Sequence, residues 1–488
     1  MNLCSISANS TRQYVSNAWL EHHYSRINIL ASPIHHSKLD QDTGTTKGKV
    51  HFISLGCARN RVDTEVMLGT LLDESWQVAE EPDQADVIII NTCGFITAAK
   101  EESIDTILSA VEHKKNNPQL IVVVAGCLTQ RYKNQLVKGL PEVDLFVGTD
   151  EFPRISEFLA GNTQETALHA KRSHYIYSGE LPKKNTLSRV AAYVKIAEGC
   201  QHHCSFCIIP AIRGRLRSRP VMNVVDEVDR LVKTGVVEVN LIAQDLAAYG
   251  REQGRDDLLY LLKNLASIDQ LQWVRLLYMY PENISELFLQ FFAENHKMVK
   301  YLDIPIQHAS DDILNKMNRG ISEAQLRSII AKVRSYVPDI AIRTSVMVGF
   351  PGESEQDFQR LLRFVEDMSL EHLGCFAYSQ EEGTVAGRMP DQIPEEIKTQ
   401  RRHQVMELQK EISARRLAKM VGNQYPVLIE GLSKETDLLA QGRLSTQAPE
   451  VDGIVYINDG PFVTGKIQTV EITESHDYDL VGKVIDPP

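Results

Sequence analysis

The chain has 488 residues, of which 43% are apolar and 24% charged, and its formal net charge is −12 at pH 7. This length exceeds one hydrophobic core and indicates about three domains, while the acidic balance disfavours a protein built mainly to bind nucleic acid. No apolar run approaches the roughly 18 residues that span a bilayer, and no secretory signal opens the chain. A cytoplasmic protein without membrane contact is therefore expected.

The N-terminal third is predicted to hold an extension and one α/β domain. Residues 1–46 mix Ser, Asn, His and Thr without an apolar period, so we expect a disordered extension. In residues 47–163, β-rich runs alternate with helical stretches, which predicts an open parallel sheet. Three runs, VHFISL, DVIIINT and IVVVAG, lead into Cys57, Cys93 and Cys127. Because the ends of parallel strands share one sheet edge, we expect these thiols to converge.

A second alternating series fills residues 186–416. Its six apolar strands are YVKIA, VVEVNLIA, WVRLLYMY, YLDIPI, IRTSVMV and LGCFAY. This series predicts an open (βα)6 barrel, two strands short of the full eight. Polar residues follow several strands, at positions that build the functional face of barrels: Gln244 and Asp245, Gln307 and His308, and Gly349 to Glu353.

The C-terminal part changes to an all-β pattern. A charged helix begins at Pro394, and residues 419–488 form short alternating runs split by Gly, Asn, Asp and Pro. Such spacing predicts a small closed β-barrel of the OB type.

The strongest chemical signal is the segment EGCQHHCSFCIIP, directly after the strand YVKIA. It places Cys200, Cys204 and Cys207 in a CxxxCxxC run. Three thiolates can hold three irons of a cubane cluster and leave the fourth iron open, where S-adenosylmethionine can bind. Zinc is the alternative, but it prefers four protein ligands, and His202 and His203 do not match the common zinc spacings.

The remaining cysteines divide into one candidate set and two without a role. Cys57, Cys93 and Cys127 sit where helix N-termini favour thiolate, so a second cluster is expected on them. Cys4 lies in the extension and Cys375 inside an apolar strand, and neither is assigned as a ligand.

The cysteine loop, with Phe206 between its last two cysteines, resembles the motif of the radical S-adenosylmethionine superfamily. With the three upstream cysteines and the C-terminal β module, the chain resembles the methylthiotransferases, which transfer a sulfur-containing group, over roughly nine tenths of its length. The resemblance implies two [4Fe–4S] clusters, one on each set of three cysteines, together with S-adenosylmethionine. It also implies that the C-terminal barrel is of the TRAM type.

The resemblance places cofactor contacts in VGFPGES, where we expect Gly349, Pro351, Gly352 and Glu353 to take part. Glycines at a strand end let the backbone approach a ligand closely. After the second barrel strand the superfamily often has an acidic Gly-Gly-Glu-like element. This chain has Ala243, Gln244 and Asp245 there, so the last two are candidate contacts, and Phe206 is expected to shield the cluster.

A basic run follows the cysteine loop in IRGRLRSRP. It contains Arg213, Arg215, Arg217 and Arg219. Two interpretations stay open: a solvated basic face, or recognition of a carboxylate of the cofactor or substrate by arginine forks.

Two branches of the resembled family differ in substrate. One, the MiaB type, modifies an adenosine of transfer RNA, and the other, the RimO type, modifies an aspartate of ribosomal protein S twelve. The segments LIAQDLAAYG, LLYMYPENI, LDIPIQH and FAYSQEEGT resemble the second branch. Residues 419–488 contain five Lys or Arg and eleven Asp or Glu, a balance of −6 that suits a cationic ribosomal protein better than RNA.

By this resemblance, the barrel cluster reduces S-adenosylmethionine to a radical that takes a hydrogen from the aspartate β-carbon. The second cluster supplies sulfur, and a further S-adenosylmethionine supplies the methyl group. The implied partners are the ribosomal protein, free or in the small subunit, and an electron donor such as flavodoxin or ferredoxin, with RNA contact only through the ribosome. The closest alternative is the transfer-RNA enzyme. A non-enzymatic iron–sulfur carrier is less favoured, because it needs no barrel with polar strand ends.

Overall fold

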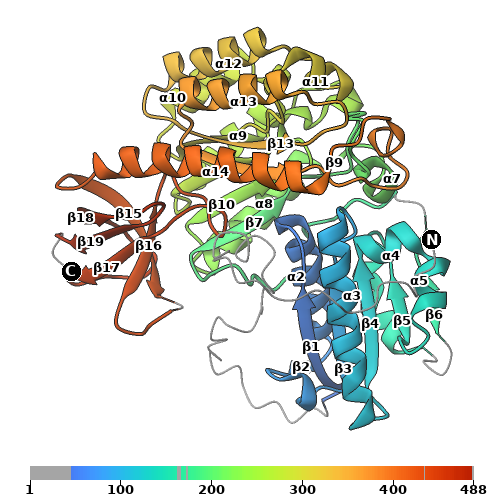
Figure 1. Ribbon diagram of the computed structural model, residues 1–488. Helices are drawn as coiled ribbons and strands as arrows, with labels where there is room; N and C mark the ends of the chain where they lie inside the picture. The colour runs from blue at the N-terminus through green and yellow to red at the C-terminus, as the bar shows by residue number, and fades with distance from the viewer. Residues whose placement is uncertain (1–45, 162–165, 172–173, 434, 486–488) are drawn as a thin grey trace. The chain divides into compact units, whose positions relative to one another are not determined.

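The computed structural model describes residues 46–161, 166–171, 174–433 and 435–485 (Figure 1). The predicted extension, residues 1–46, lies outside the described residues except for Thr46, and so does Cys4. The chain forms two compact units. The first comprises Met1–His174 and Leu181–Lys184, and the second comprises Tyr175–Glu180 and Asn185–Pro488.

The first unit is built on a six-stranded parallel sheet with the strand order β2-β1-β3-β4-β5-β6. Its strands are β1 (Gly48–Ser54), β2 (Trp76–Val78), β3 (Val87–Thr92), β4 (Ile121–Gly126), β5 (Leu145–Val147) and β6 (Ala167–His169). The central strand β3 is buried along its whole length, as expected where helices cover both faces of a parallel sheet. The predicted open parallel sheet is confirmed.

Helices of the first unit connect its strands. They are α2 (Ala58–Asp73), α3 (Thr97–Glu112), α4 (Cys127–Tyr132), α5 (Asn134–Gly139) and α6 (Ile155–Leu159). Helix α2 has the heaviest burial, and Val62 and Val66, one turn apart, are fully buried. Because only three residues separate the end of β1 from the start of α2, the first turn of α2 lies at the sheet edge where the strands end.

The second unit contains a six-stranded parallel sheet in the order β14-β13-β12-β11-β10-β7. Its strands are β7 (Ala191–Lys195), β10 (Glu238–Ile242), β11 (Trp273–Leu277), β12 (Met298–Asp303), β13 (Ala341–Val348) and β14 (His372–Ala377). Neighbours in the sheet are also consecutive in the chain, as in a βα barrel. Each of the six strands expected from the sequence is present, and the sheet does not close, so the partial barrel is confirmed.

Helices alternate with these strands. They are α7 (Ile209–Arg213), α8 (Val221–Lys233), α9 (Leu258–Ala266), α10 (Glu286–Glu294), α11 (Asp311–Lys316), α12 (Glu323–Tyr336), α13 (Glu355–Met368) and α14 (Glu395–Ala418). In α8, Val224, Val228 and Val232 recur at a spacing of four residues, and all three are buried in the barrel core. The charged helix α14 runs along the barrel toward the C-terminal strands and packs on β14 (Figure 1).

The C-terminal strands form a small closed barrel in the order β15-β16-β17-β19-β18. They are β15 (Gln424–Leu432), β16 (Ala440–Leu444), β17 (Val455–Asp459), β18 (Ile467–Ser475) and β19 (Leu480–Val484). Its interior is filled by apolar side chains that alternate along the strands, such as Val427 and Ile429 on β15 and Val470 and Ile472 on β18. The closed β-barrel predicted for the C-terminal part is confirmed.

The loop between β16 and β17, residues 445–454, joins the closed barrel to the partial barrel; we call it the floor loop. Together with Arg443 it receives one side chain from each of the six parallel strands. These contacts are Tyr193 Oη to Pro449 O (3.2 Å), Glu238 with Arg443, Arg275 Nη1 to Ser445 O (2.7 Å), Tyr301 Oη to Asp452 Oδ2 (2.8 Å), Arg343 Nε with Asp452 Oδ1 (3.6 Å), and His372 Nε2 with Thr446 O (2.7 Å). Glu238, Arg343 and His372 lie in the first half of their strands, Tyr193 and Arg275 lie at the middle, and Tyr301 lies just past it. The loop thus satisfies polar side chains of the barrel interior.

Candidate functional site

In the first unit, three cysteines follow three neighbouring strands. Cys57 comes after β1 at the N-cap of α2, Cys93 comes directly after β3, and Cys127 follows β4 as the first residue of α4. The strands β1, β3 and β4 are adjacent and parallel, so the three cysteines lie at one edge of the sheet. We call Cys57, Cys93 and Cys127 the sheet cysteines.

Two glycines let the loops of the sheet cysteines approach one another. Gly56 has φ +91°, and a Cβ added there would lie 3.0 Å from Cys93 Cβ and 3.4 Å from Cys93 Sγ. A Cβ added at Gly94 would lie 2.9 Å from the backbone carbonyl of Cys127. A side chain at either glycine would push the loops apart, so glycine at these positions supports the convergence expected from the sequence.

Asn60, in the first turn of α2, holds the same loops together. Its Nδ2 donates hydrogen bonds to the carbonyls of Leu55 (3.1 Å) and Thr92 (2.9 Å), and its Oδ1 accepts from Cys127 Sγ at 3.5 Å. Asn91 Nδ2 in turn donates to the Asn60 carbonyl at 2.7 Å. Asn60 is 1% exposed, and its hydrogen bonds connect the ends of β1, β3 and β4 inside the protein. The sequence reasoning missed it, although its position three residues after a cysteine in a first helical turn was a usable signal.

In the second unit, the other three cysteines lie on one loop after β7 and the short strand β8 (Ala197–Glu198). They are Cys200, Cys204 and Cys207, and we call them the loop cysteines. The loop is fixed from the segment after α11: Ser205 N donates to Met317 O (3.0 Å), and Ser205 Oγ donates to Lys316 O (2.7 Å). It is therefore held by residues more than a hundred positions away in the chain.

Burial affects the protonation of two loop thiols, those of Cys200 and Cys207. It raises the pKa of Cys200 to about 11 and that of Cys207 to about 12. As free thiols both are protonated at neutral pH, and a bound metal would supply the positive charge that favours the thiolate.

A buried ion network lies immediately before the loop cysteines. The Glu198 carboxylate pairs with Lys195 Nζ at 2.7 Å and with Arg213 Nη1 at 3.2 Å, and it accepts a hydrogen bond from Gln244 Nε2 at 2.9 Å. These cations and hydrogen bonds lower the pKa of Glu198 despite its burial. Glu198 was not predicted as a site residue, although it stands two positions before Cys200 in the strongest motif.

Gln244, a predicted cofactor contact, lies on this network. Its Oε1 is buried and has no hydrogen-bond partner within the described part of the chain. An acceptor left open beside the cysteine loop fits the N–H groups of an amino-acid moiety such as that of S-adenosylmethionine. The structure therefore offers a polar group suited to the cofactor at the position where the superfamily's usual acidic element is replaced.

Asp245, the second candidate after this strand, has its carboxylate occupied within the protein. Oδ1 accepts from the backbone N–H groups of Ala247 (3.0 Å) and Tyr280 (3.1 Å), and Oδ2 is 2.7 Å from His202 Nε2. The His202 ring stacks on Tyr280 with centroids 3.9 Å apart. Asp245 thus orients a histidine of the cysteine loop, and any effect on a cofactor would pass through that loop.

Lysine side chains pack against the two glycines of the turn that follows β13. Gly349 and Gly352 have φ +73° and +74°; a Cβ at Gly349 would overlap Lys398 Cγ, and one at Gly352 would lie 2.8 Å from Lys316 Nζ. Both glycines are required by backbone conformation and packing. Lys398 and Lys316 occupy the space beside the two glycines, and contact of the glycine backbone with a cofactor stays a prediction. Pro351 between the glycines is buried.

Glu353 supports the glycine turn from below. Its side chain is fully buried and bonds the Gly349 backbone N–H, His308 Nε2 at 3.1 Å and Arg401 Nη1 at 2.9 Å. Both oxygens of the Glu353 carboxylate contact groups of the protein itself, so the carboxylate stabilises the conformation of the glycine turn.

Phe206 packs into an apolar cluster beside the cysteine loop. The cluster contains Ile313, Met317, Phe350 and Tyr378, with Phe206 at its margin and partly buried. This placement joins the loop to α11 and to the glycine turn.

The basic run after the loop cysteines is largely structural. Arg213 pairs with Glu198, and Arg219 pairs with Glu227 at 2.7 Å; each is 2% exposed. Only Arg215 of the run is exposed. For the two buried arginines both interpretations were wrong, because their carboxylate partners are internal, and a basic run in the sequence does not reveal which of its members face inward.

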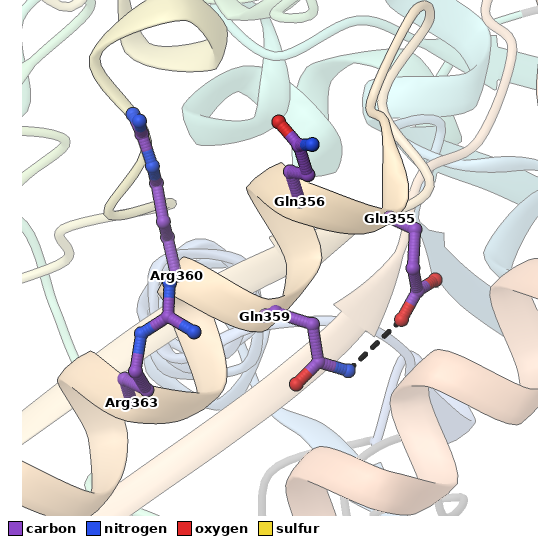
Figure 2. Close-up of a pocket in the computed structure, with 5 residues that line it drawn as sticks. All are labelled: Glu355, Gln356, Gln359, Arg360 and Arg363. Carbon is purple, nitrogen blue, oxygen red and sulfur yellow. Dashed lines mark hydrogen bonds between the residues drawn. The ribbon is translucent and has the colours of Figure 1, made fainter.

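No three His, Cys, Asp or Glu side chains among the described residues lie close enough to hold a single metal ion. The irons of a cubane occupy separate corners, so its thiolate ligands need not meet at one point. An open hollow on α13 is lined by Glu355, Gln356, Gln359, Arg360 and Arg363, with Gln359 Nε2 donating to Glu355 Oε1 at 2.9 Å (Figure 2). This hollow contains none of the predicted site residues.

Three parts of the chain match known protein families. Residues 49–148 match the uncharacterized protein family UPF0004, residues 194–365 match the radical SAM superfamily, and residues 421–485 match the TRAM domain. The chain is 47% identical to ribosomal protein uS12 methylthiotransferase RimO of Citrifermentans bemidjiense, over 90% of this chain and 99% of that protein. The chain belongs to the RimO family. It is also 48% identical to the RimO protein of Geotalea uraniireducens over 90% of this chain and 99% of that protein.

The family and the class of enzyme predicted from the cysteines are thereby confirmed, and the transfer-RNA branch is not favoured. Among solved structures, the methyltransferase TsrM of Kitasatospora setae is 15% identical over 67% of this chain and 73% of that chain, with a TM-score of 0.49. No helix among the described residues has the length and apolar character needed to cross a membrane.

Proposed function

We propose that this RimO-family chain adds a methylthio group to the β-carbon of an aspartate of ribosomal protein uS12. The observation that carries the proposal is the pairing of two cysteine triads with near full-length identity of 47% to a protein of that name. The relatives named above are called uS12 methylthiotransferases, and the acidic C-terminal barrel, at −6, suits a cationic ribosomal protein.

Each cysteine triad would hold one [4Fe–4S] cluster: Cys200, Cys204 and Cys207 on the barrel loop, and Cys57, Cys93 and Cys127 at the sheet edge. Three thiolates leave one iron of a cubane without a protein ligand. When bound, the loop cluster with S-adenosylmethionine supplies the radical that activates a C–H bond, and the sheet cluster supplies the sulfur.

The protein's own groups would bind and orient these cofactors. Gln244 Oε1 would accept from the cofactor's amino group, while the backbone from Gly349 to Gly352 would line the adenosyl side. Glu353 and Asp245 would act by holding the glycine turn and His202 in place, and Phe206 would keep water from the cluster. The contacts described above support the roles given to Gln244, Glu353, Asp245 and Phe206.

The setting of the reaction is proposed on the same basis. The substrate would be met free or in the small subunit, in the cytoplasm, and a flavodoxin or ferredoxin would deliver electrons. The functional modules would be residues 47–163 for the sheet cluster, 186–416 for radical chemistry and 419–488 for substrate contact.

The test uses full-length protein reconstituted without oxygen and supplied with S-adenosylmethionine and reductant. Purified uS12 and total transfer RNA are offered separately, and each is analysed by mass spectrometry. Methylthiolated aspartate in uS12 with unmodified transfer RNA is expected. Modified transfer RNA with unmodified uS12 would overturn the substrate, and a protein that binds no iron would overturn the cofactor assignment.

A further inference from the structure

Arg319 is a buried cation without a carboxylate partner. The second unit has seven buried arginines among its described residues, and six of them pair with an acidic side chain. The pairs are Arg213–Glu198, Arg219–Glu227, Arg275–Glu238, Arg343–Asp303, Arg401–Glu353 and Arg443–Glu238. Arg319 is 5% exposed, and no acidic side chain of the described residues forms an ion pair with it. An uncompensated buried charge is costly, so its survival indicates a missing anion.

The contacts of Arg319 point to where that anion would be. Its Nη1 donates to Cys204 Sγ at 3.5 Å, and its Nη2 donates to Pro305 O at 2.6 Å. Its Nε is buried and finds no hydrogen-bond partner among the described residues. The sulfur that it reaches belongs to a loop cysteine, which becomes a thiolate when a cluster binds.

Tyr280 fixes the guanidinium in this orientation. The guanidinium carbon lies 4.1 Å from the Tyr280 ring centroid, and Tyr280 Oη donates to the Arg319 carbonyl at 2.6 Å. Tyr280 also carries the stacked ring of His202, whose backbone N–H donates to Cys200 Sγ at 3.4 Å. The arginine and the cysteine loop are therefore held by the same aromatic side chain.

We propose that Arg319 is a positioning residue that supplies the counter-charge of the loop cluster and sets its reduction potential. A hydrogen bond and a positive charge at a ligating sulfur stabilise the reduced, more negative cluster, so they raise the potential. This inference rests on the proposed function, because it requires a cluster on the loop cysteines.

The test measures the cluster potential in full-length protein by redox titration followed by electron paramagnetic resonance. The sheet cysteines are replaced by alanine so that only the loop cluster contributes. Arg319→Gln is expected to shift the midpoint to a more negative value, and Arg319→Lys is expected to shift it less, because an ammonium keeps the charge but not the two-pronged geometry. Arg360→Gln, an exposed arginine of α13 drawn in Figure 2, is the matched control and should not change the midpoint.

Iron content and circular dichroism accompany each titration. An unchanged midpoint in Arg319→Gln at full iron content overturns the inference while leaving the proposed function intact. Loss of the cluster from folded Arg319→Gln, with recovery in Arg319→Lys, supports it. If the glutamine variant does not fold, a second neutral variant, Arg319→Met, decides: a more negative midpoint supports the counter-charge, and an unchanged midpoint at full iron content refutes it. Absence of a loop cluster in the parent protein would instead refute the proposed function.

Discussion

The sheet cysteines and the loop cysteines are assembled in opposite ways. The sheet cysteines come from three separate strand ends, drawn together by glycines and by a neutral amide, Asn60. The loop cysteines come from one short loop, and charged groups lie next to it: Glu198 with its cations precedes Cys200, and Arg319 donates to Cys204 Sγ. Cysteines on one short loop are close together without further support, so the residues next to them can adjust the charge at the site. The sheet cysteines instead need neighbouring residues that hold three strand ends together.

The sharpest way to separate the two sets is to remove loop cysteines. Cys200→Ala, Cys204→Ala or Cys207→Ala should abolish both cofactor cleavage and methylthiolation, because two thiolates no longer hold the cubane open to S-adenosylmethionine. Chromatography of 5′-deoxyadenosine measures cleavage. Cys375→Ala, at a buried cysteine of β14, is the control and should keep both activities. Full cleavage in any loop variant would contradict the assignment.

Replacing sheet cysteines should break only half of the reaction. Cys57→Ala, Cys93→Ala or Cys127→Ala should keep cofactor cleavage and lose methylthiolated product, with iron content reduced by about half. The same chromatography and mass spectrometry of uS12 provide both readouts. Persistent methylthiolation in these variants would show that the two sets do not divide the chemistry.

Neutralising Glu198, next to the loop cysteines, should lower the free energy of unfolding by an amount that depends on pH. Glu198→Gln leaves Lys195 and Arg213 buried without their carboxylate, which should cost about 3 kcal/mol at pH 7. The folded pKa of Glu198 is lowered, so its contribution is complete above its ordinary value of 4.5 and is lost as pH falls through the folded value. Thermal unfolding at pH 7, 5.5 and 4 should show equal deficits at the first two values and a smaller one only below 4.5. If the stability lost in Glu198→Gln already decreases between pH 7 and 5.5, the lowered pKa assigned to Glu198 would be wrong.

The smallest effect is expected from replacing Asn60, the neutral amide that hydrogen-bonds the loops of the sheet cysteines. Asn60→Ala leaves the carbonyls of Leu55 and Thr92 without their donor, at a cost of about 1–3 kcal/mol, and should lower iron binding by the first unit while sparing cofactor cleavage. Asn134→Ala, an exposed asparagine of the same unit, is the control. Iron analysis and thermal unfolding measure both effects. Equal iron content in the two variants would remove Asn60 from the site.

The fold followed from the sequence because its signals are local. Apolar runs and turn residues predict the strands of all three modules. Cys93 and Cys127 directly follow the ends of β3 and β4, and Cys57 follows the end of β1 by three residues. The supporting residues did not follow, because their partners are distant. Arg319 and Cys204 are 115 positions apart, and Arg443 and Glu238 are 205 apart. The arginine run was misinterpreted for the same reason, since burial of Arg213 and Arg219 depends on carboxylates brought in by tertiary packing.

The floor loop makes residues 419–488 inseparable from the module that carries the loop cysteines. A shortened chain that ends after α14 would remove one polar partner from each of the six parallel strands, so we expect it to aggregate rather than fold as a minimal enzyme. Chimeras that exchange this module between relatives would need to carry the loop and its matching strand residues together. If a substrate binds the C-terminal barrel, the floor loop would also keep the distance from that binding surface to the cysteine loop constant. The enzyme would then select substrates by the distance between the bound surface and the modified residue as well as by charge.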